Sequence, residues 1–524
     1  MSIDSSLQAR KDAYSEGLKP GGDRLLYLFC LVLGVGACAS AALLSQLELK
    51  YMLGAVGVIG VAFVALLLAD RERLFPFFLA IFALSIPFRV SVGFFYRKHM
   101  GGAAGIDLSL SIACIIMLYA LTLLSRSKKG EGSVFTANRR LFWTQIAFIM
   151  AGIISLVNAT DYLLSLYELI RLAYLFLFFF LIMNLKEEKH LRLLIFFFSI
   201  GVLSQAVLTV IQYKTGTSLG LEIFGEMALL QEKIGYTFTR ATGTIGHPNI
   251  LAYYFEILLP LMFALVLVEH RKGVRLWYII VTLAGLVGIM TTLSRAGWLT
   301  IPLSFTIVFL VLTRKKLFEA KTIIGIVVAI SVALVFLSFS FPTILDRYTH
   351  DDYGSAQSRI PVNMAAISVI KQFPIAGVGI NNLGVVFQKF DQTGGAQIYK
   401  GRGISNVVHN MYLHVWVETG TIGLIAFLSM FLSALIVAAR HVHKVGEWQS
   451  AVLVGIFAGL FAHMIHGLFD PGYRMAMNIS SLVYSLFGII AAITLINKRA
   501  GEEAERIEVS GHQKPVLQRG QANE

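Results

Sequence analysis

Runs of about 20 mostly apolar residues follow one another along almost the whole chain, and this repetition constrains the fold more than any other feature. A helix of about 20 apolar residues crosses the hydrocarbon core of a bilayer. In lipid the backbone must satisfy its own hydrogen bonds, and a helix does so within one segment. The sequence therefore predicts an all-α, polytopic integral membrane protein with about fourteen transmembrane helices. These cover residues 25–45, 51–69, 74–90, 106–125, 141–159, 162–184, 191–213, 249–268, 276–293, 296–313, 322–341, 415–439, 450–468 and 475–497.

The composition agrees with this fold class and excludes others. Of the 524 residues, 56% are hydrophobic and only 14% are charged, whereas about a quarter of the residues in soluble domains are charged. So few charged side chains exclude a water-soluble globule and a disordered chain. The three cysteines, Cys30, Cys38 and Cys114, all fall in predicted spans. Neither a disulfide framework nor a cysteine-based metal site is therefore expected in the loops.

The net charge of +13 predicts how the helices are oriented. Cytoplasmic loops of membrane proteins are enriched in Lys and Arg. If the N-terminus is cytoplasmic, the loops on that side include the basic segments 126–140, 269–275 and 314–321. Both termini are then cytoplasmic, and the two long loops, 214–248 and 342–408, are extracytoplasmic. The basic excess is thus mainly an orientation signal, and no nucleic acid partner is expected.

The two long outer loops have the composition of folded segments. Residues 220–234 are amphipathic, and residues 359–373 combine Ile, Val, Met and Ala with two basic side chains. Long loops in compact proteins are usually functional or disordered. Because these two are rich in apolar residues, we expect both to contain short helices at the membrane interface or over the bundle.

Three short segments stand out on the outer side, each at the start of a predicted span. Their residues are 240–249, 293–297 and 409–423. Taken singly, the first is typical of a turn, the second of a snorkelling arginine, and the third of an interfacial histidine. Together they indicate more, because helices that run inward present free N–H groups and a positive dipole end outward. With Arg240 and Arg295 added, these ends predict an anion site that suits phosphate, with His409 at the same level.

Charged residues inside the predicted spans are few: Glu168, Arg171 and Glu256. Ionisable residues within a membrane are functional candidates by default. Glu168 and Arg171 lie three positions apart, so they form either a self-neutralising pair or part of a cavity open to the outside. His463 and His466 share a helix face, but no third ligand is in register, so metal binding is the less favoured interpretation. Residues 470–474 are interpreted first as a turn and only second as a site.

At these outer positions the sequence resembles the O-antigen ligase and polymerase superfamily, which are bacterial membrane glycosyltransferases. The resemblance rests on His409-Asn410, nine further residues and then Gly420-Thr-Ile-Gly423. The superfamily signature is likewise a His, a small polar residue, nine variable positions and Gly-x-x-Gly. Residues 240–249 match the superfamily's Arg-x-x-Gly-Thr-x-Gly-x-Pro-Asn segment, and Ser294-Arg295-Ala-Gly and Gly377-Val-Gly-Ile-Asn381 match as well.

The resemblance implies a reaction and a role for each motif. The donor would be an undecaprenyl-diphosphate-linked glycan at the periplasmic face of the inner membrane, and a hydroxyl of an acceptor glycan would attack its anomeric carbon. His409 would take the proton of that hydroxyl as general base. Arg240 and Arg295 would hold the departing diphosphate. Direct attack would invert the anomeric centre, and neither a metal ion nor another cofactor is expected.

Five further residues are candidates for substrate binding in this interpretation. They are Arg171, Glu418, Asn410, His247 and Asn249. Membrane lipids are the remaining expected partner. The resemblance also suggests how the chain is organised: a cytoplasmic segment (1–24), N-terminal transmembrane helices (25–159), a catalytic membrane core with both long loops (160–470), a last transmembrane helix (471–497) and a disordered cytoplasmic tail (498–524).

Two alternatives come from other classes of protein. A lipid-linked oligosaccharide flippase or other transporter would carry polar residues at mid-membrane, and many transporters have internal repeats. In this sequence the polar residues gather at one membrane face, and no repeat is apparent. A structural scaffold would not require the His-to-Gly spacing. Between the two glycosyltransferase types, the additional N-terminal spans slightly favour a polymerase over a ligase.

Overall fold

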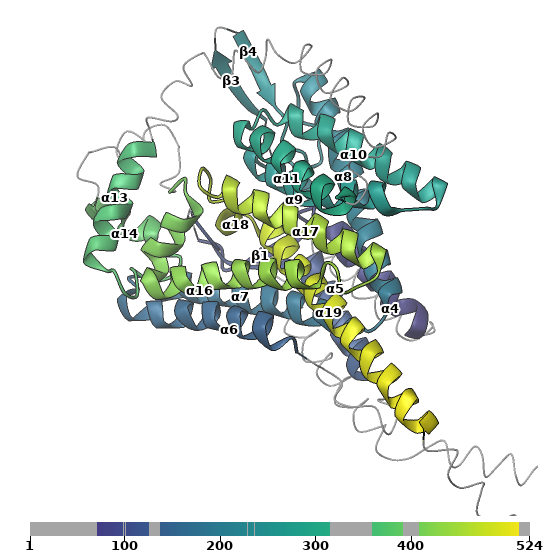
Figure 1. The fold of residues 1–524 in the computed structure, drawn as a ribbon. Coiled ribbons are helices and arrows are strands. Elements are labelled where there is room, and N and C mark those ends of the chain that lie inside the picture. Colours follow the sequence, from purple (N-terminus) through teal and green to yellow (C-terminus); the bar gives the residue numbers. More distant parts are fainter. Residues whose placement is uncertain are drawn as a thin grey trace, which may run out of the picture. The chain divides into compact units, whose positions relative to one another are not determined.

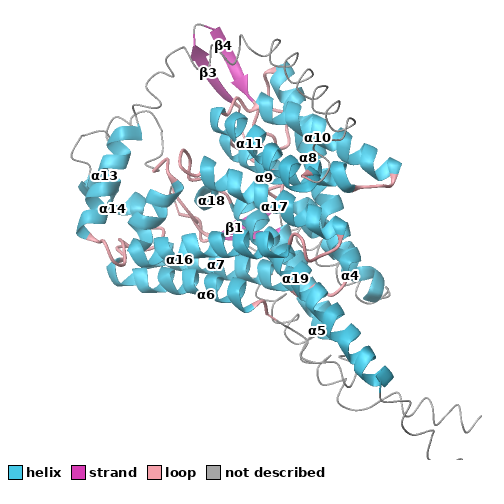
Figure 2. Ribbon diagram, viewed as in Figure 1, coloured by secondary structure: helices cyan, strands magenta, loops and turns pink. Residues whose placement is uncertain are grey.

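The structure is a computed structural model that describes residues 71–97, 99, 101–124, 137–227, 229–234, 236–314, 359–390 and 408–512. The chain divides into two units, residues 1–74 and 75–524, and the elements discussed below belong to the second (Figures 1 and 2). Among the described residues, nine helices are long and apolar enough to cross a membrane. The only strands described form two short hairpins. The fold class is therefore that of an all-α polytopic membrane protein.

The long helices are α6 (Arg139–Ile154), α7 (Tyr162–Met183), α8 (Glu188–Thr215), α9 (Pro248–Val268), α10 (Lys272–Thr291), α11 (Arg295–Thr313), α16 (Met411–His441), α17 (Glu447–His466) and α19 (Met477–His512). The 3-10 turn η1 (Ser155–Asn158) extends α6. The shorter elements are α4 (Arg71–Ser85), β1 (Ser91–Phe94), β2 (Ile106–Ser109), α5 (Leu110–Leu124), η2 (Glu222–Phe224), β3 (Leu230–Ile234), β4 (Tyr236–Arg240), α13 (Arg359–Gln372), α14 (Leu383–Phe390) and α18 (Gly472–Met475).

Nine of the predicted spans coincide with these long helices. The spans predicted at 25–45, 51–69 and 322–341 lie outside the described residues. The other two contain α4 and α5, which have 15 residues each. Such a helix is about 22 Å long at 1.5 Å per residue, which is shorter than the hydrocarbon core of about 30 Å. Residues 86–90 of the first span are non-helical and lead into β1, and β2 takes up the start of the second span.

The outer loop at 214–248 differs from the sequence prediction. The prediction of a helix over residues 220–234 is wrong. In this segment only the short turn η2 is helical, and β3 pairs with β4 as an antiparallel hairpin. Gly220 and Gly225 both have positive φ, a conformation that ends a helix. The alternating Tyr-Thr-Phe-Thr of β4 favours a strand instead.

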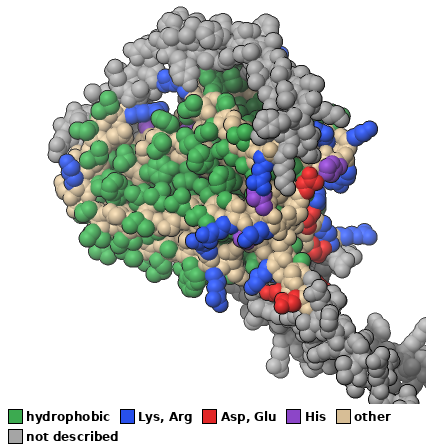
Figure 3. All heavy atoms as spheres, viewed as in Figure 1, with side chains coloured by type: hydrophobic (Ala, Val, Ile, Leu, Met, Phe, Trp, Pro, Cys, Tyr) green, Lys and Arg blue, Asp and Glu red, His purple; other side chains and the backbone are tan. Residues whose placement is uncertain are grey.

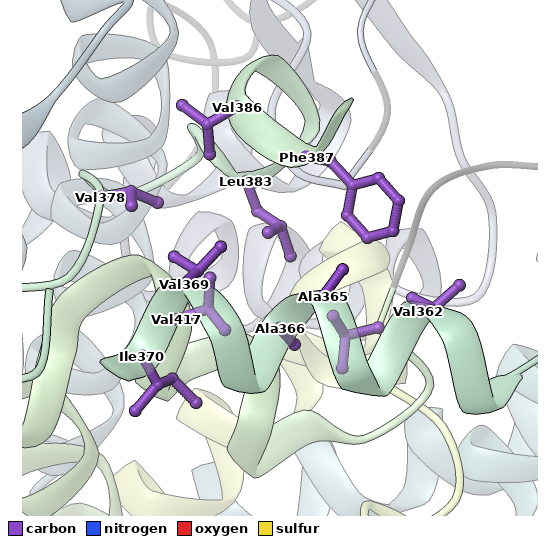
Figure 4. Packing of buried hydrophobic residues seen from close by; sticks show 11 residues of the cluster. Val362, Ala365, Ala366, Val369, Ile370, Val378, Leu383, Val386, Phe387 and Val417 are labelled. Atoms are coloured by element: carbon purple, nitrogen blue, oxygen red, sulfur yellow. The ribbon is translucent and has the colours of Figure 1, made fainter. Parts of the chain in front are cut away.

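The helix predicted for residues 359–373 is confirmed as α13. It packs with α14 and the start of α16 around a small apolar cluster (Figure 4). The cluster includes Val362, Ala366 and Val369 from α13, Leu383 and Phe387 from α14, and Val417 from α16. This outer core holds residues 359–390 against the helix that begins next to His409.

The membrane helices pack so that α9 and α19 are the most enclosed. Helix α9 contacts α10, α11 and α17, while α7 packs on α19 and α6 on α16. Outward-facing helices expose apolar side chains, as lipid contact requires, and hydrophobic side chains cover much of the face seen in Figure 3. The last helix, α19, continues to His512, so the part of the polar tail up to that residue is helical, where disorder was expected.

A break at Gly420 divides α16 inside its apparent length. Gly420 has φ 66° and ψ −170°, a combination that is essentially confined to glycine. The carbonyls of Val417 and Glu418 therefore lose the helical N–H groups four residues on. They accept instead from Val378 and Gly379, both at 3.0 Å. The displaced N–H groups of Thr421 and Ile422 donate to the carbonyls of Pro374 and Ile375 at 2.9 and 3.3 Å.

This exchange explains two of the glycine motifs in physical terms. The Gly377-Val-Gly segment and the Gly420 break are two halves of one interlocked joint. A Cβ on Gly420 would lie 2.1 Å from the Ile375 carbonyl oxygen, and one on Gly377 would lie 2.5 Å from the Glu418 backbone. Neither position accepts a side chain without movement of the backbone.

We expect Gly420→Ala to destabilise the protein strongly, because it combines a φ and ψ available only to glycine with a direct backbone clash. The expected loss is about 3 kcal/mol or more, the sum of a strained backbone and a displaced contact. The measurement is the temperature at which detergent-purified protein loses its monodisperse elution peak. Gly501→Ala is the matched control, since that glycine lies in α19 with nothing within 4 Å. Equal midpoints for the two variants would contradict the joint.

Candidate active site

The predicted outer segments meet at one end of the helix bundle. The backbone N–H of Met411, the first residue of α16, donates to the carbonyl of Gly467 just past α17, at 2.7 Å. Ala241, just past β4, donates to the carbonyl of Thr291 at the end of α10. The N-terminal ends of α9, α11 and α16 therefore lie beside the C-terminal ends of α10 and α17. The predicted orientation requires this, because it places all of these ends at the same membrane face.

Arg240 connects two of these segments. Its side chain is 7% exposed, and its Nε donates to the carbonyl oxygen of Thr292 at 2.9 Å. Its Nη2 donates to Oδ1 of Asn249 at 2.6 Å. Thr292 lies three residues before Arg295, across a sharp turn in which Leu293 has φ 52°, and Ser294 caps α11. The two arginines thus come from segments that are directly joined by hydrogen bonds.

Asn249 extends the connection to His409 through Asp470. The Nδ2 group of Asn249 donates to Oδ2 of Asp470 at 3.1 Å, and Nδ1 of His409 lies 3.8 Å from the same oxygen. At that distance the contact is an electrostatic one and longer than a hydrogen bond. The His409 side chain is 32% exposed, whereas that of Asp470 is 9% exposed. A continuous chain of contacts therefore runs from Thr292 through Arg240, Asn249 and Asp470 to a histidine that solvent can reach.

The electrostatics of Asp470 suit it to orient that histidine. Burial alone would raise the pKa of Asp470, but the nearby His409, His247 and His466 hold the pKa below its usual value. Asp470 therefore stays a carboxylate. A carboxylate facing Nδ1 favours the tautomer that carries its proton on Nδ1, which leaves Nε2 as the basic nitrogen. The sequence analysis interpreted residues 470–474 mainly as a turn and so missed this role.

Two predicted binding residues also cap helices. His247 is the N-cap of α9, and its Nδ1 accepts from the N–H of Asn249 at 3.2 Å. Asn410 is the N-cap of α16, and its Oδ1 accepts from Tyr412 and Leu413. Its Nδ2 group donates to the carbonyl of Leu468 at 3.1 Å. Both residues thus have structural roles as helix caps, and their predicted part in substrate binding stays a prediction.

Two glutamines of α8 shape the Gly-Thr-Ile-Gly turn before α9, and the sequence analysis did not identify them. Oε1 of Gln212 accepts from the N–H groups of Thr242 and Gly243, and Gln205 exchanges two hydrogen bonds with Thr244. Both glutamines are buried. Most buried polar groups in proteins are hydrogen-bonded. Two glutamines within an apolar span therefore indicated that their side chains bond another segment, and this was the signal available in the sequence.

Arg171 and Glu418 belong to a buried network of charged side chains. Arg171 pairs with Glu168, as the self-neutralising interpretation predicted. Arg474 of α18 pairs with both Glu168 and Glu418, and Nε2 of His414 lies 3.4 Å from Glu418. All these side chains are at most 6% exposed. The network ties α18, and with it the turn that carries Asp470, to α7 and α16.

A second buried cluster supports the same turn from the other side. Nδ1 of His466 lies 2.7 Å from Oε2 of Glu256, and the hydroxyl of Thr300 donates to that oxygen at 2.9 Å. Tyr253 stacks on His466, and its hydroxyl donates to the Asp470 carbonyl at 2.6 Å. Among the residues that the structure describes, no group of three or more His, Cys, Asp or Glu side chains is arranged to hold a metal ion.

The fold and this cluster define a class of protein: a polytopic membrane protein with a polar site of Arg, Asn, Asp and His at one end of its helices. The family described as O-antigen ligase matches residues 278–428, which supports the resemblance of this part of the chain to the O-antigen ligase and polymerase superfamily. No curated protein sequence matches the chain. The matched residues and the long apolar helices of the described part of the chain indicate a membrane protein that resembles this family over part of its length.

The matched region does not contain the whole site. Arg295, His409 and Glu418 lie within residues 278–428. Arg240, Asn249 and Asp470 lie outside it, on either side. The hydrogen bonds described above join these outer residues to the matched part, so the cluster extends beyond the region that defines the family.

Proposed function

We propose that this protein is a membrane glycosyltransferase of surface polysaccharide synthesis. It transfers an oligosaccharide from undecaprenyl diphosphate to an acceptor glycan at the periplasmic face of the inner membrane, either joining repeat units or capping another acceptor. The single observation that supports this most is the contact chain from Arg240 through Asn249 and Asp470 to His409. On one side of the bundle it brings together an arginine suited to binding diphosphate and a histidine base that is oriented by a carboxylate.

In this proposal the acceptor hydroxyl approaches Nε2 of His409, which removes its proton as the oxygen bonds to the anomeric carbon. The bond from that carbon to the diphosphate oxygen breaks at the same time, so the anomeric centre inverts. Arg240 and Arg295 stabilise the negative charge that develops on the departing undecaprenyl diphosphate. Asp470 holds His409 in the required tautomer and stabilises the imidazolium that forms. Because diphosphate is a good leaving group, the proposal assigns no second catalytic acid and no metal ion.

Arg295→Lys is expected to lower kcat/KM for glycan transfer about 10- to 100-fold. Lysine keeps the charge but lacks the planar fork that binds phosphate oxygens in pairs, and one charge-assisted hydrogen bond contributes about 1.5–3 kcal/mol. The measurement is initial transfer rate against donor concentration. Arg314→Lys at the far end of α11, where the side chain is exposed, is the matched control. Unchanged transfer in Arg295→Lys would leave Arg295 as a snorkelling anchor.

One assay distinguishes the types of function. Purified protein is incubated with an undecaprenyl-diphosphate-linked repeat unit, and the glycan products are separated on a gel. A ladder of lengths indicates a polymerase, whereas a single transferred block on an added acceptor indicates a ligase. If glycan is never transferred but the lipid-linked donor crosses vesicle membranes, the protein is a flippase and the proposal fails.

A further inference from the structure

A pocket of about 460 Å³ lies at the end of the helices opposite His409. It is formed by the start of α8, the turn from α9 to α10, the first turns of α10 and the start of α17. Helix α9 links the two ends, since His247 caps its start and Glu269 its end. Its 21 residues span about 30 Å at 1.5 Å per residue, or about one hydrocarbon core. The pocket therefore lies at the other membrane surface, which the orientation argument makes cytoplasmic.

Cationic side chains dominate the polar part of this pocket. Lys189, Arg192 and Arg271 line it together with Glu269. Each of the three cations is paired with a carboxylate, and Lys189 pairs with Glu187 at 2.6 Å. Arg192 bonds Glu188 through Nε and Nη2, and Arg271 bonds Glu269 through the same two atoms. Among the described residues, no hydrogen bond is formed by Nη1 of either arginine, which leaves these amino groups as donors for an anion. In Figure 3, charged side chains gather at the edge where α9 turns into α10.

Aromatic side chains complete the lining and hold one cation in place. Cζ of Arg192 lies over the ring of Trp448, 4.1 Å from its centroid, so the guanidinium contacts the indole face. Trp277 and Tyr278 line the pocket from α10. Tryptophan and tyrosine side chains concentrate at the level of lipid head groups. The pocket thus combines fixed cations with the aromatic residues typical of the membrane interface.

An apolar stripe leaves the pocket along the outside of α10. Leu276, Ile280 and Leu283 are spaced as neighbours on one helix face and are 56%, 46% and 56% exposed. Phe196, which lines the pocket from α8, is 40% exposed. Such a surface suits acyl chains, because each exposed CH₂ favours an apolar neighbour over water. A head-group pocket and a path for the chains therefore adjoin each other.

We propose that this pocket binds the phosphate of an anionic phospholipid, with the acyl chains lying along the outer face of α10. Basic pockets between transmembrane helices on the cytoplasmic side suit such head groups, and the volume lies within the usual range for ligand pockets of about 300–1,000 Å³. The lipid would contact α8, α10 and α17 and the end of α9. The opposite ends of these four helices carry Gln205 and Gln212, which bond the turn before α9, together with His247, Thr292 and Gly467. By joining the four helices, the bound lipid would stabilise the arrangement that positions the site around His409.

The test uses the purified full-length protein, delipidated in neutral detergent, and short-chain phosphatidylglycerol as the probe. Native mass spectrometry measures the fraction of protein that carries lipid as the lipid concentration rises. We expect saturable binding of phosphatidylglycerol and at least tenfold weaker binding of phosphatidylcholine, whose head group has no net charge. The double variant Arg192→Gln, Arg271→Gln should weaken phosphatidylglycerol binding at least tenfold. Trp448→Leu, which keeps the charges and removes the stacking surface, should weaken it about threefold or more.

The matched control is the double variant Arg139→Gln, Arg140→Gln, which removes two exposed cations from the start of α6, outside the pocket. It should bind phosphatidylglycerol as the unaltered protein does. Inorganic phosphate at millimolar concentration identifies the source of the anion: competition would show a free-phosphate site and overturn the lipid assignment. Equal loss in the pocket and control variants, or no loss in either, would overturn the pocket itself. None of these outcomes depends on glycan transfer, so the inference stands or falls independently of the proposed reaction.

Discussion

Replacing His409 with alanine is expected to abolish glycan transfer while the protein still inserts and purifies normally. A general base contributes about 10²–10⁴-fold to a rate. The Nδ1 of His409 faces the Asp470 carboxylate, whereas Nδ1 of His247, the other partly exposed histidine near Asp470, caps α9. The side chain of His409 makes only the 3.8 Å contact with Asp470 among the interactions described, so its loss leaves the packing intact. The measurement is the initial rate of transfer from an undecaprenyl-diphosphate-linked donor at saturating acceptor.

The matched control for this prediction is His443→Ala, an exposed histidine just beyond the far end of α16. It should transfer glycan at the unaltered rate, because it lies at the opposite end of α16 from His409. Thermal midpoints of both variants should equal that of the unaltered protein. A His409→Ala protein that retains more than about a tenth of the transfer rate would exclude His409 as the general base.

Replacing Arg474 with alanine is expected to cause the largest loss of stability. Arg474 pairs with Glu168 and Glu418 in a site where its side chain is 2% exposed. Without it, Glu168 keeps Arg171, but Glu418 keeps only His414, which balances its negative charge only when the imidazole is protonated. Breaking a buried pair in this way costs about 3–5 kcal/mol. The measurement is the thermal midpoint of the purified protein, followed by the loss of its monodisperse elution peak.

A double variant distinguishes the loss of charge balance from the loss of packing. Arg474→Met with Glu418→Gln removes one charge of each sign and keeps the side-chain volumes similar. We expect this pair to be at least about 1 kcal/mol more stable than Arg474→Met alone, because contacting residues couple by 0.5–3 kcal/mol. Arg440→Ala at the exposed end of α16 is the neutral control. If the double variant is no more stable than the single one, the network contributes through packing and not through charge.

The sequence predicted the elements whose signal is local. Nine described spans were predicted because a bilayer requires long apolar helices, and α13 was predicted from its apolar composition. The hairpin of β3 and β4 was missed because amphipathic spacing was given more weight than two glycines. The short helices α4 and α5 were taken as full spans because hydropathy alone does not show where Pro87 and a hairpin end them.

The candidate site was predicted in part, for a similar reason. Arg240, Arg295 and His409 stand in recognisable motifs. Asp470 carries no motif, and it reaches His409 only because α17 returns the chain to the start of α16. The pairing of Arg474 with Glu168 and Glu418 joins three helices that are far apart in the sequence. Such contacts follow from how helices pack, which composition and spacing along one chain do not specify.

The break at Gly420 separates the first turns of α16, next to the proposed base, from the hydrogen-bond ladder of the rest of that helix. Only residues 411–419 of α16 precede the break, and the hydrogen-bond ladder does not cross it. The carbonyls of Val417 and Glu418 bond the N–H groups of Val378 and Gly379 in place of the rest of α16. His409 instead takes its position from the outer core of α13 and α14 and from the carbonyl of Gly467. The position of His409 is thus set by the packing at that end of the bundle and not by the part of α16 that follows Gly420.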